Sequence, residues 1–232
     1  MQVASTHDPR SALAQCEATL AQDPQDYEAS WRAASALIAI GQQTASEAPD
    51  PARDSMYDQA EAHARKAVAA DPKGAQGHFI LAHAIGLASA AKGDSERIKR
   101  AAEIRTEALR AIELDPSHDG AFHVMGRWHA AIARVPGFQR FFARNLLGGR
   151  VFDEASWERA VTALETAVAL TPQRIDHRVA LGEVYIDLKR YDDARAQLTA
   201  VASLLVEDPL DPSFKERAVE RLGQIEGKRD GR

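Results

Sequence analysis

Histidine is the residue type in this chain with the widest chemical repertoire, because imidazole can bind a metal ion or transfer a proton near neutral pH. The 232 residues include eight histidines, at His7, His63, His78, His83, His118, His123, His129 and His177. None of them lies at the spacing from a carboxylate residue that is typical of metal ligands on one helix. Only a metal site formed by residues that are distant in the sequence stays open. No nucleophile motif, glycine-rich phosphate loop or zinc-protease pattern is present. The sequence therefore predicts a protein that is not an enzyme and that needs no metal and no cofactor.

Cys16 is the one cysteine of the chain. An internal disulfide and a thiolate metal site are therefore excluded. Free cysteines are most often buried and unreactive, and we expect the same of Cys16.

A repeated phrase indicates which elements position these residues: an alanine-rich amphipathic segment that ends in Asp-Pro or Thr-Pro. The phrase occurs five times, with its prolines at Pro24, Pro72, Pro116, Pro172 and Pro209. Proline ends one helix and fits the first turn of the next, so the five boundaries indicate helix pairs. In the register of a tetratricopeptide repeat, Gly126, Gly182 and Ala194 fall where two helices approach closely. The predicted fold class is all-α, a tetratricopeptide-like solenoid of antiparallel helix pairs with one inserted helix.

The expected helices follow from the apolar periodicity between these boundaries. They span about residues 8–22, 26–40, 52–70, 74–91, 95–114, 118–134, 138–147, 155–170, 174–188, 191–207 and 212–226. Gly41, Gly93 and Gly148 stand where glycines that end helices belong. One unit exceeds the usual period of about 34 residues by about 22, which places an insertion at about residues 135–156. We expect a single domain over residues 1–232, with a disordered tail over about 227–232.

The first helix of each pair lines the concave groove of such a stack, and the register picks out its inward-facing side chains. The candidate ligand-binding residues are Trp31, Phe79, His83, His123, Arg127 and Glu183. An apolar groove with a few polar anchors suits a peptide or a lipid. The alternative for Trp31 and Phe79 is packing between neighbouring helices. A charge such as Arg127 gains less from packing, so we expect it to contact a ligand.

The insertion is rich in phenylalanine and arginine. Its apolar residues Phe138, Phe141, Phe142 and Leu146 follow helical spacing. The three phenylalanines and Arg144 are candidates for a lid over the groove or for a contact with lipid headgroups and acyl chains. The alternative, which we favour for buried aromatic residues, is an extra helix that fills the core of the array.

The composition excludes several classes of protein. With 45% hydrophobic residues the chain is too apolar to be disordered, and its net charge of -5 argues against nucleic-acid binding. No apolar run reaches the roughly 20 residues of a transmembrane helix, and the residues after Met1 do not have the pattern of a signal peptide. We expect a cytoplasmic protein, or a periplasmic or otherwise exported one whose N-terminal signal is absent from this sequence.

Several phrases between about His118 and Leu222 are more specific than a generic repeat. They are Gly126-Arg127-Trp128, the insertion that ends in Leu146-Leu147-Gly148-Gly149, and Leu181-Gly182-Glu183-Val184-Tyr185. With them the chain resembles the regulator of microtubule dynamics family of tetratricopeptide proteins. Animal members are associated with microtubules, and a membrane-anchored one with organelle contacts and phospholipid binding, so the resemblance implies a module that binds a lipid or a partner. The usage of alanine and arginine is similar to that of a bacterial relative, for which a microtubule role is not expected.

The sequence thus predicts a non-catalytic binding module with a concave groove. The leading hypothesis is a lipid or other amphipathic ligand, with Arg127 and the histidines at its polar end and with peripheral membrane contact through the insertion. The alternative is a protein-protein interaction scaffold that holds a peptide or a partner helix.

Overall fold

The computed structural model describes residues 8–43, 50–136 and 153–230, and no strand occurs in these ranges. The helices that lie wholly within them are α1 (Pro9–Gln22), α2 (Tyr27–Gln43), α3 (Pro51–Ala70), α4 (Ala75–Ala88), the 3-10 helix η1 (Ser89–Ala91), α5 (Asp94–Leu114), α6 (Asp119–Arg134), α8 (Trp157–Leu170), α9 (Ile175–Asp187), α10 (Tyr191–Ser203) and α11 (Asp211–Gln224). They group into two compact units, Met1–Pro116 and Ser117–Arg232.

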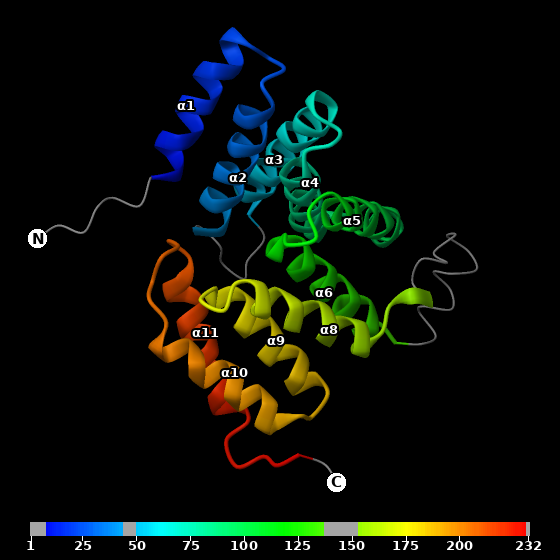
Figure 1. The fold of residues 1–232 in the computed structure, drawn as a ribbon, viewed down its shortest axis with the longest axis vertical. Helices are drawn as coiled ribbons and strands as arrows, with labels where there is room; N and C mark the ends of the chain where they lie inside the picture. The colour runs from blue at the N-terminus through cyan, green and yellow to red at the C-terminus, as the bar shows by residue number, and fades with distance from the viewer. Residues whose placement is uncertain (1–7, 44–49, 137–152, 231–232) are drawn as a thin grey trace, which may run out of the picture. The chain divides into compact units, whose positions relative to one another are not determined.

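In the first unit each helix from α1 to α5 packs against the next one in the chain (Figure 1). Its core combines the inner faces of α2, α3 and α4, with Leu37, Ile38, Ile80, Leu81 and Ile85 as the large buried side chains and alanines from α3 beside them. A smaller cluster joins α1 to α2 through Cys16, Ala29 and Ala33. Cys16 is buried as expected, and burial raises the pKa of its thiol.

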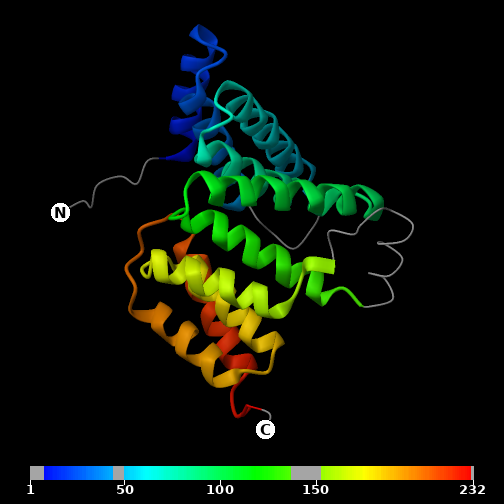
Figure 2. The same ribbon diagram turned by 45° about the vertical axis from the view of Figure 1, so that its right-hand side comes forward.

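In the second unit α6 packs against α8, α8 against α9, and α9 against α10, while α11 contacts both α9 and α10 (Figures 1 and 2). One core cluster joins α6, α8 and α9 around Leu164, Leu181 and Val184. Another joins α9, α10 and α11 around Ile175 and Leu198. The closing helix α11 is therefore part of the packed unit.

Most helix ends lie where the Asp-Pro phrase predicts them. Asp23, Asp71 and Asp115 are the C-terminal caps of α1, α3 and α5, each in an extended conformation that the following proline favours. Asp50 begins α3, and its side chain accepts hydrogen bonds from the backbone N–H groups of Ala52 and Arg53. The expected helix over 138–147 lies outside the described residues.

Two expected boundaries are wrong. The helix expected over 191–207 ends at Ser203, because Pro209 disfavours helix before it and the Asp211 carboxylate accepts hydrogen bonds from the backbone N–H groups of Glu207 and Asp208 at 2.9 and 2.8 Å. Gly41 does not end a helix but lies inside α2. Gly93 does follow a helix end, since η1 continues α4 to Ala91, and it also caps the start of α5.

The close helix approaches expected at Gly126 and Gly182 are present. A Cβ atom on Gly126 would lie 2.5 Å from Cγ of Leu164 on α8, and one on Gly182 would lie 2.7 Å from Cγ of Leu198 on α10. Each pair of the second unit thus packs a leucine of its second helix onto a glycine of its first. Ala194, the third expected small residue, is fully buried.

Residues 227–230, expected to begin a disordered tail, contact α10: Arg195 donates a hydrogen bond to the Lys228 carbonyl, and the Asp192 N–H donates to Asp230. Among the described residues no helix is both long and apolar enough to cross a membrane. The single domain expected over the whole chain stays a prediction.

Candidate functional site

A pocket of about 310 Å³ opens in the second unit between the faces of α6, α9 and α11. We call it the arginine pocket. Its lining consists of Arg127, Ala130, Arg134, Ala180, Glu183, Val184, Ile186, Asp187, Arg217, Arg221 and Gln224. The three helices contribute different chemistry: α6 and α11 supply the guanidinium groups, and α9 supplies both carboxylates and most of the apolar wall.

Glu183 is the central acid of the pocket. Its carboxylate accepts two hydrogen bonds from Arg217, at 2.6 and 2.9 Å, and one from Nε of Arg221 at 3.0 Å. Burial on its own would raise the pKa of this carboxyl, but Arg217, Arg221 and Arg127 outweigh burial and lower it. Glu183 is therefore ionised at neutral pH, and it ties α11 to α9.

Arg134 and Asp187 form the second ion pair of the pocket, in which Nε of Arg134 donates to the carboxylate at 2.9 Å. The same guanidinium lies 5.8 Å from the ring centroid of Trp157. Cation–π contact and charge pairing together hold Arg134 at the rim of the pocket.

Arg127 differs from the other arginines of the pocket, because it makes no hydrogen bond or ion pair with any residue that the structure describes. Its side chain is accessible to water, although protein atoms surround the recess in which it lies. Desolvation lowers the pKa of its guanidinium, with Arg217 and Arg134 acting in the same direction and Glu183 in the opposite one. An arginine pKa is so high that Arg127 remains charged.

The charges of the lining do not balance. Four guanidinium groups face two carboxylates, which leaves a surplus of two positive charges in a chain whose overall charge is -5. Planar guanidinium forks match the geometry of carboxylate and phosphate groups. Because Arg217, Arg221 and Arg134 are already paired, Arg127 is the guanidinium with capacity for an added anion.

The structure brings some of the expected site residues together and separates others. Arg127 and Glu183 both line the arginine pocket, and their expected ligand role stays a prediction. His123 lies one helical turn before Arg127 on α6, and its ring contacts His177 of α9. Phe138, Phe141, Phe142 and Arg144 lie outside the described residues.

Trp31, Phe79 and His83 belong to the first unit. Trp31 and Phe79 are half-buried and pack against its core cluster, in line with the packing alternative for these two residues. The ring of His83 lies 6.0 Å from that of Phe79. A ligand role for the three residues stays a prediction.

The sequence analysis missed several residues that the structure places in or near the arginine pocket. Arg217 and Arg221 come from α11, which follows the last pair and has no repeat position of its own. Asp176 occupies the second position of its repeat, a groove-facing position in the same register, so this residue could have been found from the sequence. The described residues with metal-ligand geometry are His123, Asp176 and His177.

Comparison with known structures identifies the fold. The crystal structure of TTC0263, a thermophilic TPR protein from Thermus thermophilus, matches with a TM-score of 0.65 at 21% identity, over 92% of this chain and 90% of that chain. A human IFIT1 dimer with PPP-AAAA matches with a TM-score of 0.52 at 16% identity, over 96% of this chain and 52% of that chain. These similarities confirm the all-α, tetratricopeptide-like fold class.

Comparison of sequences identifies the family. The chain is 27% identical over 137 residues to regulator of microtubule dynamics protein 1 of Bos taurus, a match that covers 58% of this chain and 43% of that protein. The chain thus spans less than half the length of this curated relative. The model of the family described as regulator of microtubule dynamics protein 1-3 matches residues 2–226. The chain therefore belongs to the regulator of microtubule dynamics protein 1-3 family.

Proposed function

We propose that this helical-repeat interaction module binds an acidic group of a partner protein in its arginine pocket. The observation that carries the proposal is the surplus of two positive charges in the lining, with Arg127 the guanidinium that has no ion pair among the described residues. A carboxylate that enters the pocket gains a charge-assisted hydrogen bond from Arg127 without breaking an existing ion pair.

The lining also limits what kind of segment can enter. Ala130, Ala180, Val184 and Ile186 form an apolar wall beside the charges. An acidic side chain followed by a small apolar one would contact both parts of the lining. The cavity has room for a few side chains, so most of a partner segment would lie outside it.

Binding suits this pocket better than catalysis. Both carboxylates of the described lining are held by arginines, and a general base needs a carboxylate or imidazole free to take a proton. The family and the fold are those of TPR-like scaffold or binding proteins, which are generally non-catalytic.

The lipid hypothesis has one supporting observation, the apolar wall beside the cationic groups, which is the arrangement that an amphipathic anion needs. The resemblance to the family raised this hypothesis, but the fold and family matches themselves name no lipid ligand. The vesicle arm of the following experiment tests it.

Fluorescence anisotropy with the full chain and fluorescein-labelled hexaglutamate tests the proposal, with labelled hexaglutamine as the neutral probe. Arg127→Gln removes the charge with no ion pair among the described residues, and Arg159→Gln is the matched control, since Arg159 is exposed on α8 outside the pocket. We expect Arg127→Gln to weaken hexaglutamate binding at least tenfold, about the 1.4 kcal/mol of one charge-assisted hydrogen bond. The control should bind within about twofold of the parent chain.

If both variants lost the same affinity for hexaglutamate, its binding would depend only on the overall charge of the chain. The proposal would then be wrong. Cosedimentation with vesicles of phosphatidylcholine and phosphatidylserine forms the second arm. Vesicle binding that depends on Arg127, without hexaglutamate binding, would favour the lipid hypothesis over the protein partner.

A further inference from the structure

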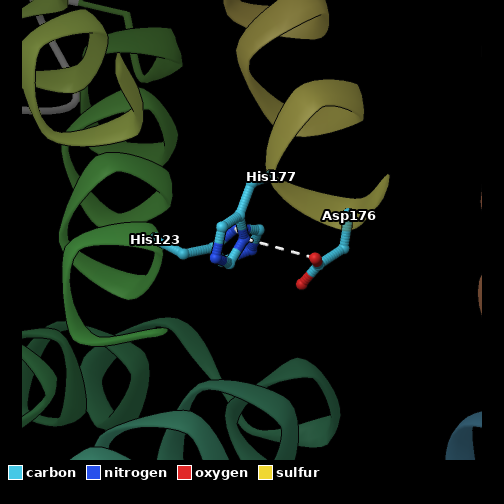
Figure 3. A group of neighbouring side chains, drawn as sticks. All are labelled: His123, Asp176 and His177. Carbon is cyan, nitrogen blue, oxygen red and sulfur yellow. Dashed lines mark hydrogen bonds and ion pairs between the residues drawn. The ribbon is translucent and has the colours of Figure 1, made fainter. Parts of the chain in front are cut away.

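A second polar cluster lies at the N-terminal turns of α6 and α9, where His123, Asp176 and His177 meet (Figure 3). Nδ1 of His177 is 2.9 Å from Nδ1 of His123 and 3.2 Å from Oδ1 of Asp176. One ligand atom from each of the three residues lies within 4.8 Å of the other two. Figure 3 shows the imidazole rings from α6 and α9 and the carboxylate from α9 directed toward one another.

Asp119 determines which nitrogen of His177 faces the cluster as an acceptor. Nε2 of His177 lies 3.0 Å from Oδ2 of Asp119, and an ionised carboxylate can only accept a hydrogen bond. Nε2 therefore carries a proton and donates it, so in the neutral ring Nδ1 presents a lone pair. Carboxylate–histidine pairs of this kind orient the imidazole ligands of metal sites.

The centre of the cluster must contain a proton or a metal cation. With Nε2 of His177 protonated, its Nδ1 lone pair faces a second imidazole nitrogen and a carboxylate oxygen, and acceptor atoms at 2.9 and 3.2 Å repel unless a cation or a proton lies between them. His177 is fully buried, so water cannot screen this repulsion at its ring. A proton can join only two of the three atoms, whereas a metal ion can contact all three.

The surrounding charges favour a cation. Arg174 is exposed and pairs with Asp176 at 3.3 Å, so two carboxylates and one guanidinium give the cluster a net negative charge around its imidazoles.

We propose that His123, Asp176 and His177 bind a divalent transition-metal ion of the Zn²⁺ type, with Asp119 as the positioning residue that orients His177. Two imidazole nitrogens and one carboxylate oxygen suit Zn²⁺, Co²⁺, Ni²⁺ or Cu²⁺, whereas Mg²⁺ and Ca²⁺ take oxygen ligands. Ligand atoms about 2.1 Å from a metal lie about 3.0 Å apart at right angles and about 3.4 Å apart in a tetrahedron. The separations of 2.9 and 3.2 Å in this cluster lie close to this range, and the third pair of ligand atoms lies within 4.8 Å.

The metal would join two repeats, since His123 belongs to the first helix of one pair and Asp176 and His177 to the first helix of the next. Three protein ligands leave at least one coordination position for water or for an acidic ligand atom. The proposal does not depend on the arginine pocket and stands on the geometry of this cluster.

Isothermal titration calorimetry with Zn²⁺ tests the proposal on the full chain, after removal of any polyhistidine tag and of bound metal with a chelator. Mass spectrometry of the metal content after dialysis gives the stoichiometry. We expect one equivalent of Zn²⁺ that Mg²⁺ and Ca²⁺ at equal concentration do not displace. Co²⁺ should give the visible absorption of a site with imidazole ligands.

Substitutions test whether the bound Zn²⁺ ion occupies this cluster. His123→Ala and Asp176→Asn should each abolish it, and both positions are only half-buried, so the fold should survive, as circular dichroism can check. Asp119→Asn should weaken Zn²⁺ binding by about 10- to 100-fold and keep the stoichiometry, which a merely structural role would not produce. His63→Ala in the first unit is the control and should bind as the parent chain does.

Two outcomes would overturn the proposal. One is the absence of a saturable Zn²⁺ equivalent in the folded parent chain, which would leave a proton shared by the imidazoles as the cation of the cluster. The other is an equivalent that persists in both His123→Ala and Asp176→Asn, since other surface groups would then bind the ion.

Discussion

Replacing Gly126 by alanine tests the close packing of α6 against α8. The new methyl carbon would lie 2.5 Å from Cγ of Leu164 and 3.1 Å from the backbone oxygen of Ala160. Ordinary contacts between carbon atoms are about 3.5 to 4.0 Å, so the leucine must move by about 1 Å. Leu164 has no exposed surface, and the atom in contact is its branching carbon rather than a mobile end.

Two opposing effects give the size of the change. Overpacking a core costs about 1 to 3 kcal/mol, and this site belongs in the upper half of that range because a backbone atom is also too close. Alanine in place of glycine stabilises a helix interior by about 1 kcal/mol. We therefore expect Gly126→Ala to lower the free energy of unfolding by about 1 to 2 kcal/mol.

Urea denaturation followed by circular dichroism measures this change. Gly223→Ala in α11 is the matched control, since a Cβ atom there meets nothing within 4 Å, and it should stabilise by up to about 1 kcal/mol. A double-mutant cycle with Leu164→Ala isolates the contact. Leu164→Ala alone should cost about 2 to 5 kcal/mol, and in its background Gly126→Ala should no longer destabilise.

The reasoning would be refuted if Gly126→Ala stabilised the chain as the Gly223 control does. It would also be refuted if the cost of Gly126→Ala were the same with and without the Leu164 side chain, because the loss would then not arise from that contact.

Two further predictions concern single polar contacts. Glu183→Gln should lower the unfolding free energy at pH 7 by about 1 to 2 kcal/mol, because a partly buried carboxylate with charge-assisted hydrogen bonds is lost. Since the folded pKa of Glu183 lies below its ordinary value of 4.5, the stability that it adds is present above that pH and is lost as the pH falls through the folded pKa. Denaturation curves of the two proteins should therefore converge in acid, and a gap that widened there would contradict the assignment. Tyr27→Phe should cost about 0.5 to 1.5 kcal/mol, because the Tyr27 hydroxyl accepts a hydrogen bond from the Gly77 N–H at 2.9 Å between α2 and α4, and an unchanged urea midpoint would show that water replaces the hydroxyl.

Much of the fold can be predicted from the sequence, because its signals are local. An Asp-Pro step ends a helix through the conformation of one residue, and a glycine at a fixed repeat position indicates a close approach before its partner is known. The end of α10 escapes such local signals because its contacts come from further along the chain: Lys215 donates a hydrogen bond to the Leu204 carbonyl, and Asp211 accepts one from the Glu207 N–H. Gly41 misleads because a glycine that ends a helix and one that packs against a ring, here that of Tyr57, are indistinguishable in a sequence.

The residues of the candidate site could be predicted only where they occupy groove-facing positions of the repeat. Arg127 and Glu183 occupy groove-facing positions and line the arginine pocket, whereas Arg217 enters it from a helix outside the repeat register. His123 and His177 are 54 positions apart, and no sequence pattern connects them. Their contact arises because each occupies the first turns of a neighbouring first helix, which only three-dimensional packing shows.

The leucine-on-glycine contact of the second unit also explains how a family can vary without losing its fold. Gly126 and Leu164 are 38 positions apart in the chain, whereas Gly182 and Leu198 are 16 apart, yet both pairs meet in the same way. Lengthening a connection between fixed ends from 16 to 38 residues costs only about 0.8 kcal/mol of chain entropy, because the cost grows with the logarithm of the length. A helix pair joined by such a contact can therefore accept new sequence between its helices at little thermodynamic cost, so natural selection can change that segment independently of the scaffold.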